Sequence, residues 1–160
     1  MNNSLAFDGV IPYEEKKKNS DDILVELSNF FRVIVDSFDE IFKKYGISRS
    51  KFNVLLILGK EKEEGLSLSQ IGERMKVSKA NITKLIDRME KENLVERKYD
   101  KRDRRIVRAE LTLKGKKLFE VIFPEYKEQW QRIISALENE EKDYLIMILK
   151  KIEKRIFENG

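Results

Sequence analysis

Apolar residues recur every three or four positions along most of the chain, which is the spacing of one face of an α-helix. The first such run follows Ser20, whose hydroxyl can cap a helix, and it stops at Gly46. It predicts an N-terminal helix over 21–46 with an apolar stripe too wide for a small domain to cover, so we expect dimerisation through it. Residues 1–20 lack this periodicity and are predicted to be a flexible leader.

Three short helices are predicted in the middle of the chain, and the last two form a closely connected pair. Ser48 is expected to cap a buried helix first, since the stretch 52–58 is apolar on nearly every side. Ser67 and Gln70 then fit a capping box that opens a very short helix. Ser78 caps the next helix, whose inward-facing residues are Ile82, Leu85, Ile86 and Met89. Two short helices joined by a tight turn, the second with a polar and basic outer face, are typical of a helix-turn-helix.

After Leu94 the apolar period changes to the alternation of β-strands. Val95 and Tyr99 share one face of a first short strand, and alternate residues of 107–111 share one face of the next. The segment between them, 100–104, is a charged hairpin tip. A basic hairpin directly after a helix-turn-helix predicts a wing.

Two further helices are predicted at the C-terminal end. Thr112 caps the first, which Pro124 is expected to kink or break, and Asn139 caps the second. The predicted fold class is therefore mainly α (α+β): a winged helix-turn-helix over 47–115, flanked by long dimerisation helices over 21–46 and 116–160.

The amino-acid composition excludes most of the familiar catalytic sites. The 160 residues include neither cysteine nor histidine, which excludes disulfides, thiolate metal sites and the commonest general base. No nucleophile, base and oxyanion group cluster in the sequence, so we expect no enzyme, no catalytic residues, no metal site and no cofactor. Apolar runs are too short for a membrane span and no signal peptide is evident, which predicts a cytoplasmic protein with no membrane partner.

Positive charge is concentrated on the predicted winged segment. Residues 66–115 carry a net charge of +6, the remaining residues −2, and the stretch 97–108 alone +5. Such a density suits DNA phosphates, whose neutralisation releases counterions. Arginine dominates the hairpin tip, and its planar guanidinium fits a narrow minor groove. Asp103 lies close enough in sequence to brace Arg105 before binding.

A second interpretation stays open from the residues alone. The long amphipathic ends could bind a different protein while the basic segment is only a solvated surface. The chain would then be a helical protein-interaction module without specific DNA binding.

The wing and the segment after it resemble the MarR family of bacterial winged-helix regulators. Residues 103–115 are similar to the family pattern of Asp-Arg-Arg, a strand ending in Leu-Thr, and then Gly. The stretch 77–95 resembles the family's recognition helix. Asn93 stands where Gly is common, and Ala109 where a larger aliphatic residue is usual.

The resemblance implies a homodimer that reads double-stranded DNA at a palindromic operator, with Arg105 in the minor groove and Asp103 orienting it. It implies a transcriptional regulator, more in keeping with a repressor because occupying a promoter needs no further surface. The expected DNA-binding residues are Ser67, Ser78, Lys79, Asn81, Thr83, Lys84, Arg88, Arg102, Asp103, Arg104 and Arg105.

Members of this family are often released from DNA by a small-molecule effector. The residues that could line such a pocket are Phe30, Phe31, Phe52, Leu55 and Trp130. A competing interpretation, which we favour, makes them ordinary core or dimer contacts.

Overall fold

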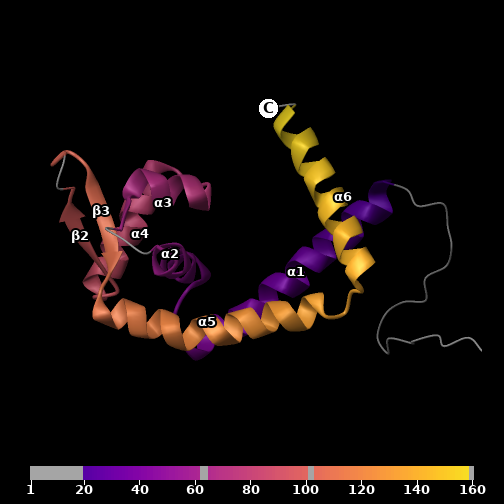
Figure 1. The fold of residues 1–160 in the computed structure, drawn as a ribbon, viewed down its shortest axis with the longest axis horizontal. Helices are drawn as coiled ribbons and strands as arrows, with labels where there is room; N and C mark the ends of the chain where they lie inside the picture. The colour runs from indigo at the N-terminus through magenta and orange to yellow at the C-terminus, as the bar shows by residue number, and fades with distance from the viewer. Residues whose placement is uncertain (1–19, 62–64, 101–102, 159–160) are drawn as a thin grey trace, which may run out of the picture. The chain divides into compact units, whose positions relative to one another are not determined.

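The structure, a computed structural model, describes residues 20–61, 65–100 and 103–158. The predicted leader lies outside these residues except for Ser20, the first residue of the first helix. The elements in order are α1 (Ser20–Lys44), α2 (Arg49–Gly59), β1 (Leu66–Ser67), α3 (Leu68–Met75), α4 (Lys79–Lys91), β2 (Val95–Tyr99), β3 (Val107–Leu111), α5 (Leu113–Ile134) and α6 (Asn139–Glu158). Figure 1 labels all of them except β1.

The strands form one antiparallel sheet in the order β1-β3-β2. Val95 pairs with Leu111 and Tyr99 with Val107, so β2 and β3 form a hairpin over their whole length. β1, which the sequence did not predict as a strand, pairs Leu66 with Ala109 on the other edge of β3. The predicted winged helix-turn-helix fold is confirmed, with the hairpin in place as its wing.

The helix starts follow the predicted caps. The Ser48 hydroxyl accepts a bond from the Lys51 N–H at 3.4 Å, and Ser67 and Gln70 form the complete capping box. The Ser78 hydroxyl caps α4, and the Thr112 hydroxyl accepts from the N–H of Gly115 at 3.1 Å. Because these bonds satisfy N–H groups that the helices leave free, local sequence fixes where each helix begins.

The structure corrects two predictions for the C-terminal helices. Pro124, expected to kink or break its helix, does not break α5, which continues to Ile134; the kink stays a prediction. Proline removes the bond to the carbonyl of Glu120, but both residues are exposed, so water can take that carbonyl while Ile122 stays buried in the core. Asn139 is inside α6 rather than its cap, because the Glu138 carbonyl accepts the first helical bond, from the Lys142 N–H at 3.0 Å.

The described chain separates into two compact units between Asp36 and Ser37. In the first unit, α1 has apolar side chains that are more than half exposed, among them Leu24, Phe30 and Phe31. None of the described helices is both long and apolar enough to cross a membrane.

Aromatic rings join three helices in the core of the second unit. Phe52 of α2 is fully buried, with its ring 4.9 Å from both Phe42 at the end of α1 and Tyr126 of α5. The Phe38 ring lies 4.9 Å from Trp130. Pairs at this spacing add to the stability that burial gives. This aromatic cluster therefore packs the end of α1 and α5 against α2 of the winged segment.

Candidate nucleic-acid interface

The turn between α3 and α4 is tight because Lys76 adopts a left-handed conformation, with φ of 54°. The N–H of Val77 then donates to the carbonyl of Gly72 at 2.9 Å. Gly72 is buried, and a Cβ there would approach Ile82 at 3.3 Å, so the two helices pack closely. Nothing in the sequence marked Lys76, since lysine seldom adopts this conformation.

Helix α4 has one buried face and one exposed basic face. The predicted inward residues are all buried, none more than 6% exposed. Lys79, Asn81, Lys84 and Arg88 are exposed and Thr83 is half-buried, as the spacing predicts. Lys79, Lys84 and Arg88 have no ion-pair partner within the described part of the chain, so these cations are available to phosphates.

Residues at the base of the wing form a hydrogen-bonded network around Asp100, which is only 8% exposed. One carboxylate oxygen accepts a bond from Arg108 Nε at 2.5 Å, and the other accepts from the Asp103 N–H at 3.1 Å. Arg108 also donates to the carbonyl of Gly65, just before β1, at 3.2 Å. The network ties the hairpin tip to both edges of the sheet. Sequence reasoning missed Asp100, because its role depends on contacts across strands.

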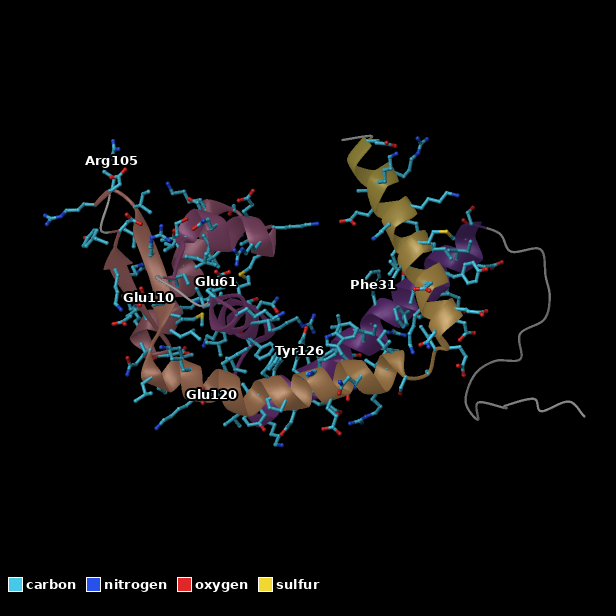
Figure 2. The ribbon with its side chains drawn as sticks, viewed as in Figure 1. Phe31, Glu61, Arg105, Glu110, Glu120 and Tyr126 are labelled. Atoms are coloured by element: carbon cyan, nitrogen blue, oxygen red, sulfur yellow. The ribbon has the colours of Figure 1, made fainter. Side chains whose placement is uncertain are left out.

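At the tip of the wing, Asp103 holds Arg105 with two parallel bonds, as the sequence predicts. Its Oδ1 accepts from Arg105 Nε at 3.0 Å and its Oδ2 from Nη2 at 2.9 Å. The side chain of Arg105 is 90% exposed and points away from the sheet (Figure 2). Bonds from the Arg105 side chain and then its backbone N–H hold the pKa of Asp103 below its ordinary value.

Most of the basic residues in the described part of the wing are held by acids. Arg97 pairs with Asp87 and Glu90, Lys98 with Glu96 and Glu110, and Arg108 with Asp100. Arg104 has no acidic partner among the described residues. Arg105 is paired with Asp103, but its side chain is 90% exposed. Among the described basic residues of 97–108, those available to DNA are therefore the two at the hairpin tip, Arg104 and Arg105.

The remaining predicted residues lie apart from this group. Ser67 is half-buried, and its hydroxyl already caps α3. Arg102 lies outside the described residues, so its predicted DNA contact stays a prediction. Tyr99, predicted to share one strand face with Val95, is 72% exposed, whereas Val95 is buried.

We expect binding to DNA to be independent of pH between about 5.5 and 7. The chain has no histidine, and the lowered pKa of Asp103 keeps its pair with Arg105 intact above the ordinary aspartate value. That pair is lost only as pH falls through the lowered pKa. Fluorescence anisotropy at constant ionic strength measures this; a change of affinity across that range would contradict it.

Comparison with known proteins decides the family. The MarR family model matches residues 47–107. The HTH-type transcriptional regulator MhqR of Bacillus subtilis is 31% identical over 130 residues, covering 81% of this chain and 88% of the relative. The chain belongs to the MarR family.

A second relative, the HTH-type transcriptional repressor MdtR of Bacillus subtilis, is 33% identical over 120 residues, covering 75% of this chain and 76% of the relative. Among solved structures, S. aureus MepR in complex with DNA has a TM-score of 0.72 and 23% identity, covering 80% of this chain and 96% of that one. This likeness shows that the chain shares the fold of the MepR structure.

The residues proposed for an effector pocket of this MarR-family chain fall into different settings. Phe52 and Leu55 have no exposed surface and belong to the core. Trp130 is half-buried against Phe38. Phe30 and Phe31 lie in the other unit and are exposed. A shared pocket stays a prediction.

Proposed function

We propose that the protein is a homodimeric, sequence-specific DNA-binding transcriptional regulator that acts in the cytoplasm and is more in keeping with a repressor than an activator. The recognition helix α4 enters the major groove, and the wing places Arg105 in the minor groove. The observation that carries the proposal is the braced guanidinium of Arg105 at the exposed tip, beside a helix whose free cations face solvent. The family membership and the repressor name of one relative support it.

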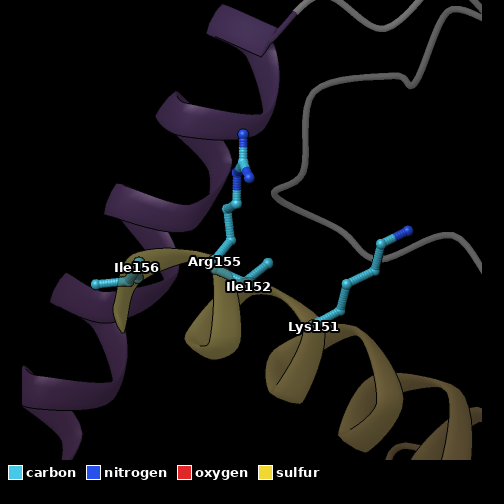
Figure 3. A pocket seen from close by; sticks show the side chains of 4 residues that line it. All are labelled: Lys151, Ile152, Arg155 and Ile156. Atoms are coloured by element: carbon cyan, nitrogen blue, oxygen red, sulfur yellow. The ribbon is translucent and has the colours of Figure 1, made fainter. Parts of the chain in front are cut away.

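Exposed apolar surface supports the dimer. On α6 the exposed side chains include Met147, Leu149, Ile152 and Ile156, and the last two line a pocket with Lys151 and Arg155 (Figure 3). The exposed apolar residues of α1 and α6 are too many to count as the single surface hydrophobics that most proteins carry. A second copy of the chain offers the same apolar faces in return.

We include release by a small-molecule effector in the proposal, and its support is the family membership alone. Because Phe52 and Leu55 are wholly buried, a ligand that contacts them has to separate α2 from its neighbours. A ligand that contacts Trp130 does not.

Selection of bound duplexes from a random-sequence pool tests the function. The proposal predicts an enriched inverted repeat with half-sites about one helical turn apart. No enrichment by the folded protein would favour the helical interaction module instead.

Salt dependence gives a separate check on the interface. Four exposed cations in each chain are placed for phosphate contact, while Arg105 is assigned to the minor groove: Lys79, Lys84, Arg88 and Arg104. Doubled in a dimer, they agree with the expected log–log slope near −6 to −10, which corresponds to about 7 to 11 phosphate contacts. Titration of the selected duplex at several salt concentrations measures the slope, and a flat response would contradict the phosphate assignment.

A further inference from the structure

Arg97 is a basic residue of the wing whose charge is directed into the protein. It lies at the centre of β2, opposite Ala109 of β3, and its side chain is only 25% exposed. Its Nη2 lies 2.6 Å from the Asp87 carboxylate, and its Nη1 lies 2.7 Å from that of Glu90. The guanidinium also donates to the carbonyl of Thr83 at 3.4 Å. One side chain of the wing therefore binds three residues of α4.

The two carboxylates occupy a sensitive place on the recognition helix. Asp87 lies four residues after Thr83 and three after Lys84, so it shares the helix face on which both are expected to meet DNA. Its side chain is 46% exposed. An uncompensated carboxylate there would repel DNA phosphates and oppose the neighbouring cations.

We propose that Arg97 is a positioning residue for DNA binding, which neutralises Asp87 and Glu90 and locks the wing to the recognition helix without touching DNA itself. The inference rests on the proposed function, since it concerns how the same interface is assembled. The fork of the guanidinium suits this role, because it can hold two carboxylates and a carbonyl at once.

The test is a double-mutant cycle on binding of the selected duplex. Arg97→Gln is expected to weaken binding about tenfold, since each of two subunits loses charge interactions of the size typical of exposed pairs. Asp87→Asn is expected to restore most of that loss in the Arg97→Gln background and to change wild-type binding little. A purely structural role of Arg97 would give no rescue, because Asp87→Asn returns no contact to the sheet.

Lys98 supplies the matched control. It is the next residue of β2 and also has two acidic partners, Glu96 and Glu110, but both of these lie on strands. Lys98→Gln removes the same charge without freeing a carboxylate on α4, so it is expected to weaken binding less than Arg97→Gln. Equal losses in the two variants would overturn the inference.

The salt slope separates positioning from contact. Each lost phosphate contact reduces the magnitude of the log–log salt slope by about 0.9. Arg104→Gln should show this reduction for each subunit, whereas Arg97→Gln should keep nearly the wild-type slope. A reduction in Arg97→Gln as large as in Arg104→Gln, without rescue by Asp87→Asn, would make Arg97 a direct DNA contact and overturn the inference.

Folding is checked by circular dichroism before binding is compared. If Arg97→Gln is unfolded, Arg97→Lys replaces it, because an ammonium keeps the charge but cannot bridge both carboxylates in the same way. Asp87→Asn is then expected to improve binding of Arg97→Lys more than of the wild type, and equal effects would overturn the inference. Wild-type protein that selects no duplex would refute the proposed function and this inference with it; wild-type binding matched by Arg97→Gln would refute the inference alone.

Discussion

Replacing Gly115 by alanine is expected to lower the free energy of unfolding by about 3 kcal/mol or more. A Cβ at this position would lie 2.0 Å from the backbone carbonyl oxygen of Leu94, and a backbone atom cannot move aside as a flexible side chain does. The carbonyl is fixed in turn, because it accepts a bond from the Thr112 N–H at 3.2 Å. The substitution must therefore displace the start of α5 from the segment that leads into the wing.

Gly46→Ala is the matched control for this prediction. Gly46 also has no side chain, but nothing lies within 4 Å of its hypothetical Cβ. Its φ of 62° makes alanine cost about 1 kcal/mol from backbone conformation alone. Urea unfolding of both variants at one fixed protein concentration measures the difference, since the stability of a dimer depends on concentration. If the two variants lost the same free energy of unfolding, the predicted clash of the new Cβ at Gly115 with Leu94 would be wrong.

Arg105→Ala is expected to produce the largest loss of DNA affinity. Each wing should lose about 1 to 3 kcal/mol, and the two wings of a dimer should add to about 2 to 6 kcal/mol. The reason is the exposed, pre-oriented guanidinium that Asp103 holds by two bonds. Asp103→Asn should cost less, because it loosens the orientation of Arg105 but keeps its charge.

Lys127→Ala is the control for a lost positive charge. Lys127 is exposed in the middle of α5, away from the wing in sequence, and its removal should leave binding nearly unchanged. Fluorescence anisotropy with the selected duplex measures all three variants. If Arg105→Ala bound DNA as tightly as Lys127→Ala, the assignment of the wing tip would be wrong.

Local sequence predicted the features that depend on neighbouring residues. The caps at Ser48, Ser67, Ser78 and Thr112 are confirmed, since each acts on N–H groups within its own first turn. Asn93, which stands where Gly is common in the family, adopts a left-handed conformation with φ of 57°, which Asn tolerates better than most residues. The periodicity of α4 likewise identified its buried face correctly.

What the sequence could not predict depends on contacts between distant segments. The bond from Arg108 to Gly65 spans 43 residues, and no spacing rule connects them. A count of charges likewise treated Arg97 and Lys98 as available to DNA, although acids hold both. The break expected at Pro124 does not occur, because the cost of proline in a helix depends on whether the freed carbonyl faces water.

Sedimentation velocity of the protein with two duplexes tests the central claim of dimeric, sequence-specific binding most directly. One duplex carries the selected inverted repeat, and the other has one half-site scrambled. We predict two chains on the intact duplex and an affinity at least about 100-fold weaker for the scrambled one, since several mismatched base pairs each cost about 1 to 3 kcal/mol. One chain per duplex, or equal affinity for both, would contradict the claim.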